Sequence, residues 1–328
     1  MLSGFYGTNR SEGCVRTLVT GGAGFIGSHL TESLLADGHA VRVVDCFTDY
    51  YDEKIKAANV EQIRQHDAAE LVEADLRTAD LAELLDGVDV VFHQAGQPGV
   101  RLSWGDGFAA YDSLNVLATQ RLLEASRAAD VRRFVYASSS SVYGNAARYP
   151  TTEADLPQPM SPYGVTKLAA EHLCGLYAAN WGVPTVALRY FTVYGPRQRP
   201  DMAFNRMIGA ALNDTPFPLY GTGDQIRDFT YVGDVVAANR LAAEADLAPG
   251  TVMNIAGGGS SRLADLIDLV GELAGRAVPL DRLPAQPGDV ERTGGSIDRA
   301  AALLGWSPGT DIRAGLVAQV AWQRERLA

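Results

Sequence analysis

Short apolar runs alternate with helix-like segments through the first two thirds of the chain. The apolar runs have the length of buried strands, and the segments between them carry apolar residues at helical spacing. This alternation predicts an α/β fold, in which a doubly wound parallel sheet has helices on both faces. The runs and segments are residues 14–20, 25–38, 40–45, 80–87, 88–96, 115–130, 131–138, 167–182 and 183–191.

The regular alternation of apolar runs and helix-like segments ends near residue 195. Prolines at positions 196, 200, 216 and 218 interrupt the chain, and later helical segments are interspersed with loops. Residues 230–245 nevertheless resemble one more helical unit of the first domain. We therefore expect a larger domain of residues 14–190 plus about 225–248, a smaller mixed α/β domain of about 191–224 plus 249–328, and a flexible tail of residues 1–13.

The charge balance excludes some classes of partner. The 328 residues include 28 Lys and Arg against 39 Asp and Glu, a formal net charge of -11. No nucleic acid or anionic membrane surface is therefore expected as a partner, and any positive charge that matters must be local. Because the chain has no run of 18 apolar residues and no signal-like start, we also expect no membrane span.

The cysteines and histidines suggest no disulfide framework and no metal site. Cys14, Cys46 and Cys174 are unclustered and odd in number, and the five histidines lack metal-ligand spacing. A reducing cytoplasm fits this usage of cysteine.

A glycine pattern follows the first predicted strand. Gly21, Gly24 and Gly27 stand between that strand and a predicted helix, which Phe25 and Ile26 begin. Isolated glycines are usually turn residues, but in this context glycine allows a tight turn and lets the backbone approach a pyrophosphate at the helix N-terminus. These five residues are therefore expected to bind a nucleotide.

Acidic residues after the next strands suggest which nucleotide binds. Asp45 ends the second strand, 18 residues after Gly27, where a carboxylate can accept hydrogen bonds from the adenosine ribose. It would repel a 2'-phosphate and no arginine follows directly, so NAD is favoured over NADP, although Asp45 could also be a solvated strand end. Asp75 and Leu76 are weaker candidates for contact with the adenine.

Hydroxyl groups gather after the strand at residues 131–138. Ser138 to Ser141 follow it, and the stretch SPYGVTK comes later, at residues 161–167. Ser161 and Pro162 predict a helix start, and Tyr163 and Lys167 then share one helix face. Taken alone, the four serines could be a hydrophilic turn and the Tyr/Lys pair a surface feature.

The glycine spacing TGGAGFIG, the strand-end serines and the Tyr163/Lys167 pair together resemble the extended short-chain dehydrogenase/reductase family, and in particular its NAD-dependent nucleotide-sugar epimerases. The resemblance covers nearly the whole chain and implies a Rossmann-type sheet with a smaller substrate-binding domain. It implies that Ser139, Tyr163 and Lys167 are catalytic, with Lys167 also holding the nicotinamide ribose. A free phenol has a pKa near 10, and a nearby ammonium group favours the phenolate, so Tyr163 could act as a base.

The family resemblance also bears on the reaction. The 4,6-dehydratases and decarboxylases typically carry an acid near the end of the serine stretch, where Ser140 and Ser141 stand here. Without that acid, the expected outcome is epimerisation at carbon 4 through a transient keto sugar. Both serines are candidate substrate contacts.

Substrate clues favour conversion of UDP-glucuronate to UDP-galacturonate. Residues 189–204 resemble the uronate epimerases, with Thr192 where galactose-type enzymes usually have asparagine. Gln286 and Arg101 match similar segments, and an arginine suits a carboxylate or phosphate. The alternatives are a UDP-glucose or UDP-N-acetylglucosamine 4-epimerase, a dehydratase or decarboxylase, and a non-catalytic NAD-sensing module that kept the fold.

Residues 225–235 resemble the family's clamp for a nucleotide diphosphate. Arg227 is expected to meet the pyrophosphate of the UDP-sugar, Arg199 is a second candidate, and Asp289 could hold a ribose or cap a loop. The resemblance further implies a homodimer packed through residues 115–129 and 163–180.

Overall fold

A seven-stranded parallel sheet forms the centre of the molecule, seen in a computed structural model that describes residues 14–284 and 290–327. Every neighbouring pair in this sheet is parallel, as the sequence predicts. In spatial order its strands are β10 (Thr251–Ile255), β6 (Thr185–Tyr190), β5 (Arg133–Ser139), β4 (Val90–His93), β1 (Arg16–Thr20), β2 (Ala40–Asp45) and β3 (Ala69–Glu73).

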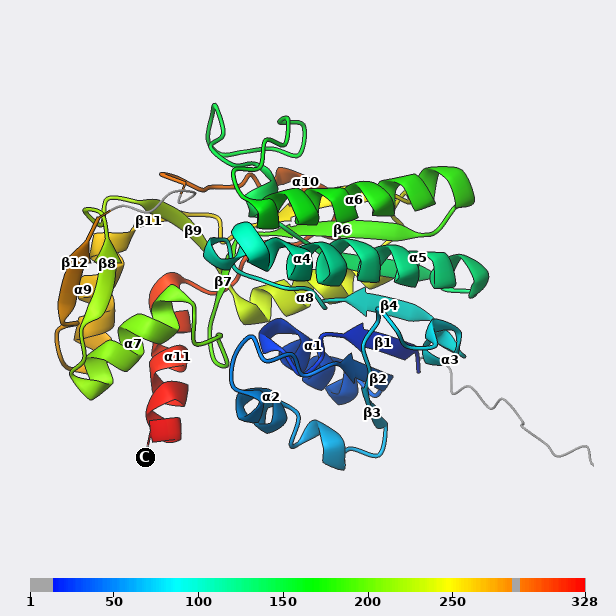
Figure 1. The fold of residues 1–328 in the computed structure, drawn as a ribbon, viewed down its shortest axis with the longest axis horizontal. Coiled ribbons are helices and arrows are strands. Elements are labelled where there is room, and N and C mark those ends of the chain that lie inside the picture. Colours follow the sequence, from blue (N-terminus) through cyan, green and yellow to red (C-terminus); the bar gives the residue numbers. More distant parts are fainter. Residues whose placement is uncertain (1–13, 285–289, 328) are drawn as a thin grey trace, which may run out of the picture.

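Helices cover both faces of this sheet, because neighbouring strand residues point in opposite directions (Figure 1). Leu18 and Val19 illustrate this, since each belongs to a different hydrophobic core. One core includes α1 (Phe25–Ala36), α8 (Val232–Glu244) and α10 (Asp298–Leu304). The other includes α3 (Leu81–Leu85), α5 (Ala118–Ala128) and α6 (Pro162–Trp181). The short helices α2 (Glu53–Asn59) and α4 (Phe108–Tyr111) lie in the connections.

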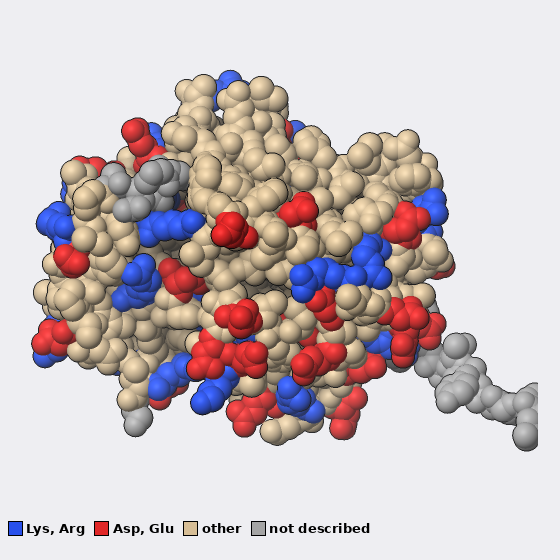
Figure 2. All heavy atoms as spheres, viewed as in Figure 1, with Lys and Arg blue, Asp and Glu red and all other residues tan. Residues whose placement is uncertain are grey.

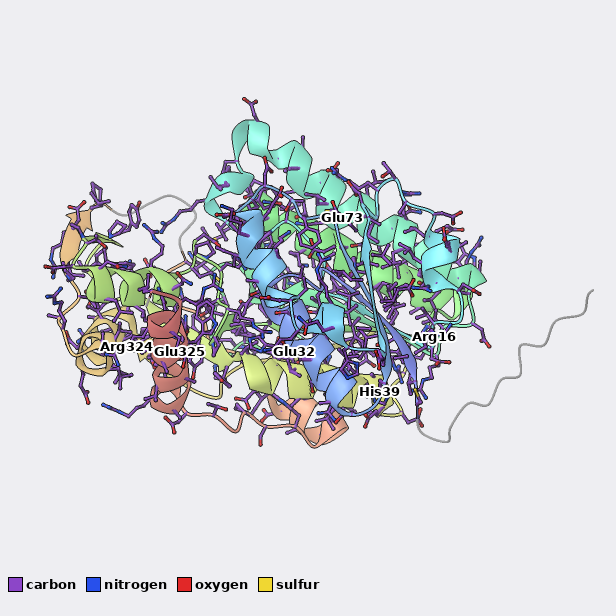
Figure 3. The ribbon with its side chains drawn as sticks, turned by 90° about the horizontal axis from the view of Figure 1, so that it is seen from below. Arg16, Glu32, His39, Glu73, Arg324 and Glu325 are labelled. Atoms are coloured by element: carbon purple, nitrogen blue, oxygen red, sulfur yellow. The ribbon has the colours of Figure 1, made fainter. Side chains whose placement is uncertain are left out.

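The smaller half has a core of its own, built around Tyr194, Phe204 and Phe229. Its strands are β7 (Thr192–Tyr194), β9 (Ile226–Tyr231) and β11 (Ser260–Arg262) in one sheet, with β8 (Phe217–Tyr220) and β12 (Leu280–Leu283) in another. Its helices are α7 (Ala203–Asn213), α9 (Leu263–Ala274) and α11 (Ile312–Leu327). Seen from below, α11 with Arg324 and Glu325 lies in this half, beside the half that contains α1 and Glu32 (Figure 3).

The chain crosses between the halves more often than the expected boundaries allow. Strand β9 was expected in the larger domain, but it pairs with β7 and β11 in the smaller one. Strand β10 was expected in the smaller domain, but it pairs with β6 and extends the large sheet. Both strands are short, and the strand that each one joins is set by contacts distant in sequence. The expected tail of residues 1–13 lies outside the described residues.

A buried ion pair fixes α6 against the large sheet. Arg189 of β6 donates from Nε and Nη2 to the Glu171 carboxylate of α6, over 3.0 and 2.6 Å. Ser138 at the end of β5 donates to the same carboxylate over 2.6 Å. Both charged side chains are 5% exposed, so the pair is nearly removed from water.

The described part of the chain has neither a helix that could span a membrane nor a group of side chains that could hold a metal ion. None of the helices within residues 14–284 and 290–327 is long and apolar enough to cross a membrane. The same residues contain no cluster of His, Cys, Asp or Glu that could hold a metal ion.

We expect Glu171→Gln to lower the free energy of unfolding by about 3–5 kcal/mol, because it leaves the Arg189 guanidinium buried without a counter-charge. The matched control is Glu272→Gln, which breaks a similar two-bond pair with Arg313 where both side chains are more than half exposed. That change should have little effect, since water screens the exposed pair. Urea denaturation of the two variants makes the comparison, and equal losses of stability would contradict the role given to burial.

Candidate active site

A cavity opens at the carboxyl ends of the central strands, where parallel sheets of this kind bind ligands. Its lining includes most of the residues expected to bind the cofactor or to react. Those residues are Gly21, Gly24, Phe25, Ile26, Gly27, Asp45, Asp75, Leu76, Tyr163 and Lys167. The structure therefore brings together residues that follow β1, end β2, follow β3 and belong to α6, although they are far apart in sequence.

The glycine loop makes room for a ligand at the start of α1. Gly21 has a φ of +67°, and a Cβ at this position would lie 2.7 Å from the backbone nitrogen of Ala95. A Cβ on Gly27 would overlap the carbonyl oxygen of Gly21. Gly24 caps α1 without a side-chain hydrogen bond, so the first amides of the helix are left for a bound group.

Asp45 has a partner that the sequence analysis missed. Its Oδ1 accepts hydrogen bonds from the Phe47 amide at 2.9 Å and from Lys56 Nζ at 3.1 Å, and its Oδ2 accepts one from the Ala23 amide. Lys56 is buried and lines the same cavity. It lies on α2, 11 residues after Asp45, where no local sequence signal links the two charges.

Asp75 is also held by a basic neighbour. Arg77 donates to its carboxylate from Nη2 over 2.6 Å, and this hydrogen bonding lowers the pKa of the Asp75 carboxyl. Asp75 and Leu76 both line the cavity at the end of β3, as expected for residues near an adenine.

The stretch at residues 161–167 forms the helix start that the sequence predicts. Ser161 Oγ accepts a hydrogen bond from the Gly164 amide at 3.1 Å, and Pro162 is the first residue of α6. Tyr163 and Lys167 then face the cavity, one turn apart. The Lys167 ammonium group is buried and lies 4.6 Å from the ring centre of Tyr136.

Burial and charge have opposite effects on the phenol of Tyr163. Burial raises its pKa, whereas a hydrogen bond with Ser139 and the positive charge of Arg199 lower it. Burial lowers the pKa of Lys167 to about 8, partly offset by the negative charge of Glu171. The net result is a phenol with a pKa above that of free tyrosine and an ammonium group that loses its proton more readily than that of free lysine, so Lys167 can take part in proton transfer near neutral pH.

The serine stretch ends β5 as a tight turn beside α6. Ser140 and Ser141 are half-buried in a 3₁₀ turn, and Ser139 Oγ accepts a hydrogen bond from the Ser141 amide at 3.1 Å. Gly164 lets the helix approach this turn, since a Cβ there would lie 2.6 Å from the Ser141 carbonyl oxygen. The three serines are thus fixed close to Tyr163.

Asn115 is a second residue that the sequence analysis missed. It is buried in a π-helical segment, Asp112–Leu117, and such segments often occur at functional sites. Its amide donates to Thr166 Oγ1 over 3.0 Å and its Oδ1 accepts from the Gln97 amide. Gly96 lies between Asn115 and Lys167, so this amide group helps to shape the reacting end of the cavity.

The expected substrate residues fall in different places. Arg199 lines the cavity close to Tyr163. Arg101 lies 4.2 Å from the ring centre of Tyr220, and Arg227 donates to the carbonyl oxygens of residues 226, 290 and 291. Thr192 of β7 is half-buried and pairs with Phe229 of β9. It does not line the cavity. Gln286 and Asp289 lie outside the described residues.

Comparisons with known proteins agree with this geometry. Residues 17–256 match the NAD dependent epimerase/dehydratase family. The chain belongs to this family. It is 42% identical to an uncharacterized UDP-glucose epimerase of Bacillus subtilis, over 94% of this chain and 98% of that protein. It is 36% identical to a probable UDP-glucuronate 4-epimerase of Rhizobium meliloti, over 94% of this chain and 96% of that protein.

A solved structure is similar over almost the whole of this epimerase/dehydratase chain. It is the UDP-glucuronic acid 4-epimerase from Bacillus cereus in complex with UDP-glucuronic acid and NAD. The TM-score is 0.92 at 40% sequence identity, with 95% of this chain and 100% of that chain covered. The expected family and the Rossmann-type fold are thereby confirmed.

The family is NAD dependent, and the residues present fit that cofactor. The glycine loop leaves space where any side chain would collide, and the free amides of α1 suit a pyrophosphate. The Asp45 carboxylate at the end of β2 suits ribose hydroxyls. Lys56 does not reverse the expected preference for NAD over NADP, because its charge is already paired with Asp45.

Proposed function

We propose that this protein is a UDP-glucuronate 4-epimerase, which interconverts UDP-glucuronate and UDP-galacturonate. The observation that carries the proposal is that Tyr163, Lys167 and Arg199 line one cavity together with the glycine loop. Relatives named for uronate epimerisation span nearly the whole chain and support the choice of substrate.

The proton-transfer residues have separate tasks in this proposal. Tyr163 removes the proton from the sugar's 4-hydroxyl, and Ser139 donates a hydrogen bond to the same oxygen. The positive charge of Lys167 stabilises the phenolate, and its ammonium group holds the nicotinamide ribose. When bound, NAD supplies the reversible oxidation of carbon 4.

The serine turn favours epimerisation over elimination. Elimination or decarboxylation in this family typically has an acidic helper, and Ser140 and Ser141 are neither acidic nor ionised at neutral pH. The keto sugar therefore turns within the site, and Tyr163 returns the proton after reduction from the other face.

Hydroxyl groups and one arginine recognise the uronate carboxylate in this proposal. Ser140, Ser141 and Thr192 lie outside the lining of the cavity that fits NAD, and their hydroxyls can donate hydrogen bonds to a sugar that extends beyond it. An arginine supplies charge and planar geometry. The charge of Arg199 already lowers the pKa of the Tyr163 phenol, so this arginine is close to the reacting group. We therefore assign Arg199 to the sugar end of the substrate and not to its pyrophosphate.

The nucleotide end of the substrate is assigned to the smaller half. Arg227 and Arg101 are the proposed contacts for the pyrophosphate, near β9 and β8. Asp289, the proposed ribose contact, lies outside the described residues. The positive charges on this side are local in a chain of net charge -11.

A UDP-glucose 4-epimerase is the second candidate. The Bacillus subtilis relative, which shares 42% of its aligned residues with this chain, is named as a UDP-glucose epimerase, and the same three catalytic candidates would serve a neutral sugar. The difference lies in whether Thr192, Ser140 and Ser141 contact a carboxylate.

We also propose a homodimer packed through α5 and α6. Leu117, Val165, Leu176 and Trp181 on or beside these helices are each close to half exposed, at 46–53%. The surface over α6 carries few charged side chains, whereas α5 bears the exposed Arg127–Glu124 ion pair and acidic side chains gather over the lower part of the same face (Figure 2). Exposed apolar side chains on neighbouring helices suit a second copy of the chain.

Residence in the cytoplasm stays a proposal. It rests on the three unclustered cysteines, which suit a reducing compartment. Fractionation of the producing cells would test it, and recovery outside the cytoplasmic fraction would contradict it.

Purified protein incubated with UDP-glucuronate should yield UDP-galacturonate to a fixed ratio, separated by chromatography. Because the cofactor is regenerated in each cycle, the product should exceed the amount of protein many times without net consumption of NAD. A UDP-pentose product would indicate decarboxylation, and turnover of UDP-glucose alone would favour the second candidate. Activity that survives in Tyr163→Phe would contradict the assigned base.

Thr192→Ala should lower kcat/KM for UDP-glucuronate by about 10-fold or more, because a hydrogen bond to a charged group is lost. The value for UDP-glucose should change little. Thr251→Ala is the matched control, since that exposed hydroxyl bonds to the Ala248 carbonyl at the far end of β10. Equal effects of Thr192→Ala on both sugars would remove the carboxylate contact from the proposal.

Ser139→Ala should move the acidic limb of the kcat/KM profile to higher pH. The Ser139 hydrogen bond lowers the pKa of the Tyr163 phenol, so its loss raises that pKa and delays formation of the phenolate. A bond of about 1 kcal/mol corresponds to a shift of roughly 0.7 pH units. Ser139→Thr keeps a hydroxyl, so its acidic limb should lie at the wild-type pH. An acidic limb at the wild-type pH in Ser139→Ala would disprove the effect of Ser139 on the Tyr163 pKa.

Leu176→Glu should convert a dimer into a folded monomer in sedimentation velocity, because it places a charge in the proposed interface. Leu303→Glu on α10 is the control, since its side chain is exposed to a similar degree outside that face. A wild-type protein that sediments as a monomer would refute the proposed interface.

A further inference from the structure

The loop between β7 and α7 is docked on α1 before it reaches the cavity. His29 Nε2 lies 2.9 Å from the carbonyl oxygen of Pro196. Arg197 donates to Glu32 over 2.7 Å and to Ser28 over 3.3 Å. These three partners all belong to α1, on which Figure 3 labels Glu32. The start of the loop is thus fixed relative to the glycine loop.

Asp201 then holds one edge of the Arg199 guanidinium. Arg199 donates from Nε to Oδ1 and from Nη2 to Oδ2, each over 3.0 Å. Among the described residues, Nη1 has no hydrogen-bond partner, and Arg199 lines the cavity. The planar fork leaves little freedom once one edge is engaged, so Asp201 determines which donors of Arg199 remain for a ligand.

Tyr50, which also lines the cavity, reaches the same carboxylate. Its hydroxyl donates to Asp201 Oδ2 over 3.3 Å, across 151 residues of chain. The hydroxyl passes over Gly99, whose φ is +97° and whose Cβ, if present, would overlap it. Tyr50 and Tyr51 meet edge to face, with ring centres 6.3 Å apart.

Residues 47–51, here termed the cofactor strap, follow the strand that ends at Asp45. Thr48, Tyr50 and Tyr51 of the strap line the cavity together with the glycine loop. A hydrogen bond from Tyr50 to Asp201 therefore joins the strap to the loop between β7 and α7, here termed the substrate loop, beside the cavity that fits NAD.

We propose that Asp201 is a positioning residue with two partners: it orients Arg199 toward the reacting sugar, and it latches Tyr50 so that the cofactor strap encloses bound NAD. The first role rests on the proposed function. The second role does not, because it concerns retention of the cofactor in any reaction that regenerates NAD within the site.

The two roles predict different defects in two variants. Asp201→Asn weakens the hydrogen bond to Tyr50 and removes the charge that holds Arg199. It should therefore change both the binding of the sugar and the release of NAD. Tyr50→Phe removes only the hydroxyl, so it should change only the rate at which NAD is released. Asp265→Asn is a charge-matched control, since Asp265 accepts Nε and Nη2 of Arg262 at an exposed site elsewhere.

Release of NAD is measured first, without any sugar. Protein loaded with radiolabelled NAD is chased with unlabelled NAD, and the label retained on a filter is followed with time. Loss of one hydrogen bond should speed release about fivefold in Tyr50→Phe and at least as much in Asp201→Asn, with Asp265→Asn unchanged. A wild-type rate of release in Tyr50→Phe overturns the latch.

The role of Asp201 in orienting Arg199 is tested by measuring KM and kcat separately for two UDP-sugars. Asp201→Asn should raise KM for UDP-glucuronate about 10-fold while kcat falls less, and KM for UDP-glucose should stay near the wild-type value. Equal changes for both sugars overturn the orienting role, because a general structural defect would cause them. If wild-type protein does not turn over UDP-glucuronate, the proposed function fails, but the NAD-release test of the latch still decides that part.

Discussion

The buried ion pair of Glu171 and Arg189 joins β6 to the two elements that carry the catalytic candidates, β5 and α6. Glu171 lies one turn after Lys167 on α6, Arg189 lies on β6, and Ser138, which donates to Glu171, directly precedes Ser139 on β5. Two buried charges are costly unless their donors and acceptors are matched, and Arg189 Nη1 completes the match by donating to the Tyr143 hydroxyl. This matching specifies one rotation of α6, because any other would leave a charge buried without partners. The placement of Tyr163 beside Ser139 follows from it.

Elsewhere in the cavity, positive charge is supplied together with an acid that orients it. Lys56 is held by Asp45, and Arg199 is held by Asp201, so each basic group is fixed in position in a chain of net charge -11. Lys167 is treated differently, since it lies over the Tyr136 ring and burial lowers its pKa to about 8. The cations that bind are therefore fixed by carboxylates, and the cation assigned to catalysis has an ammonium group whose proton is easier to remove.

Local patterns predicted what depends on neighbours in sequence. The buried runs predicted five of the strands in the parallel sheet, the glycine spacing located the loop at Gly21, and Ser161 with Pro162 located the start of α6. Contacts between distant residues were not predicted. The Lys56 pairing with Asp45, the Tyr50 bond to Asp201 and the position of Arg199 have no periodic signal, because each depends on how separate loops meet over the sheet. The same limit applies to β9 and β10, whose few residues pair with strands on the other side of the expected domain boundary.

The two sides of the site differ in how firmly they are held. The proposed epimerisation requires the sugar to turn over while the cofactor stays in place, so the cofactor side has to be the more rigid. On that side the substrate loop is tied to α1 through Arg197 and Glu32, and Asp45 and Lys56 are buried. On the nucleotide side, Arg101 meets Tyr220 by an exposed cation–π contact, worth about 0.5–1 kcal/mol. The groups proposed to hold the cofactor are thus buried and paired, whereas Arg101, proposed to meet the UDP-sugar, is exposed to solvent.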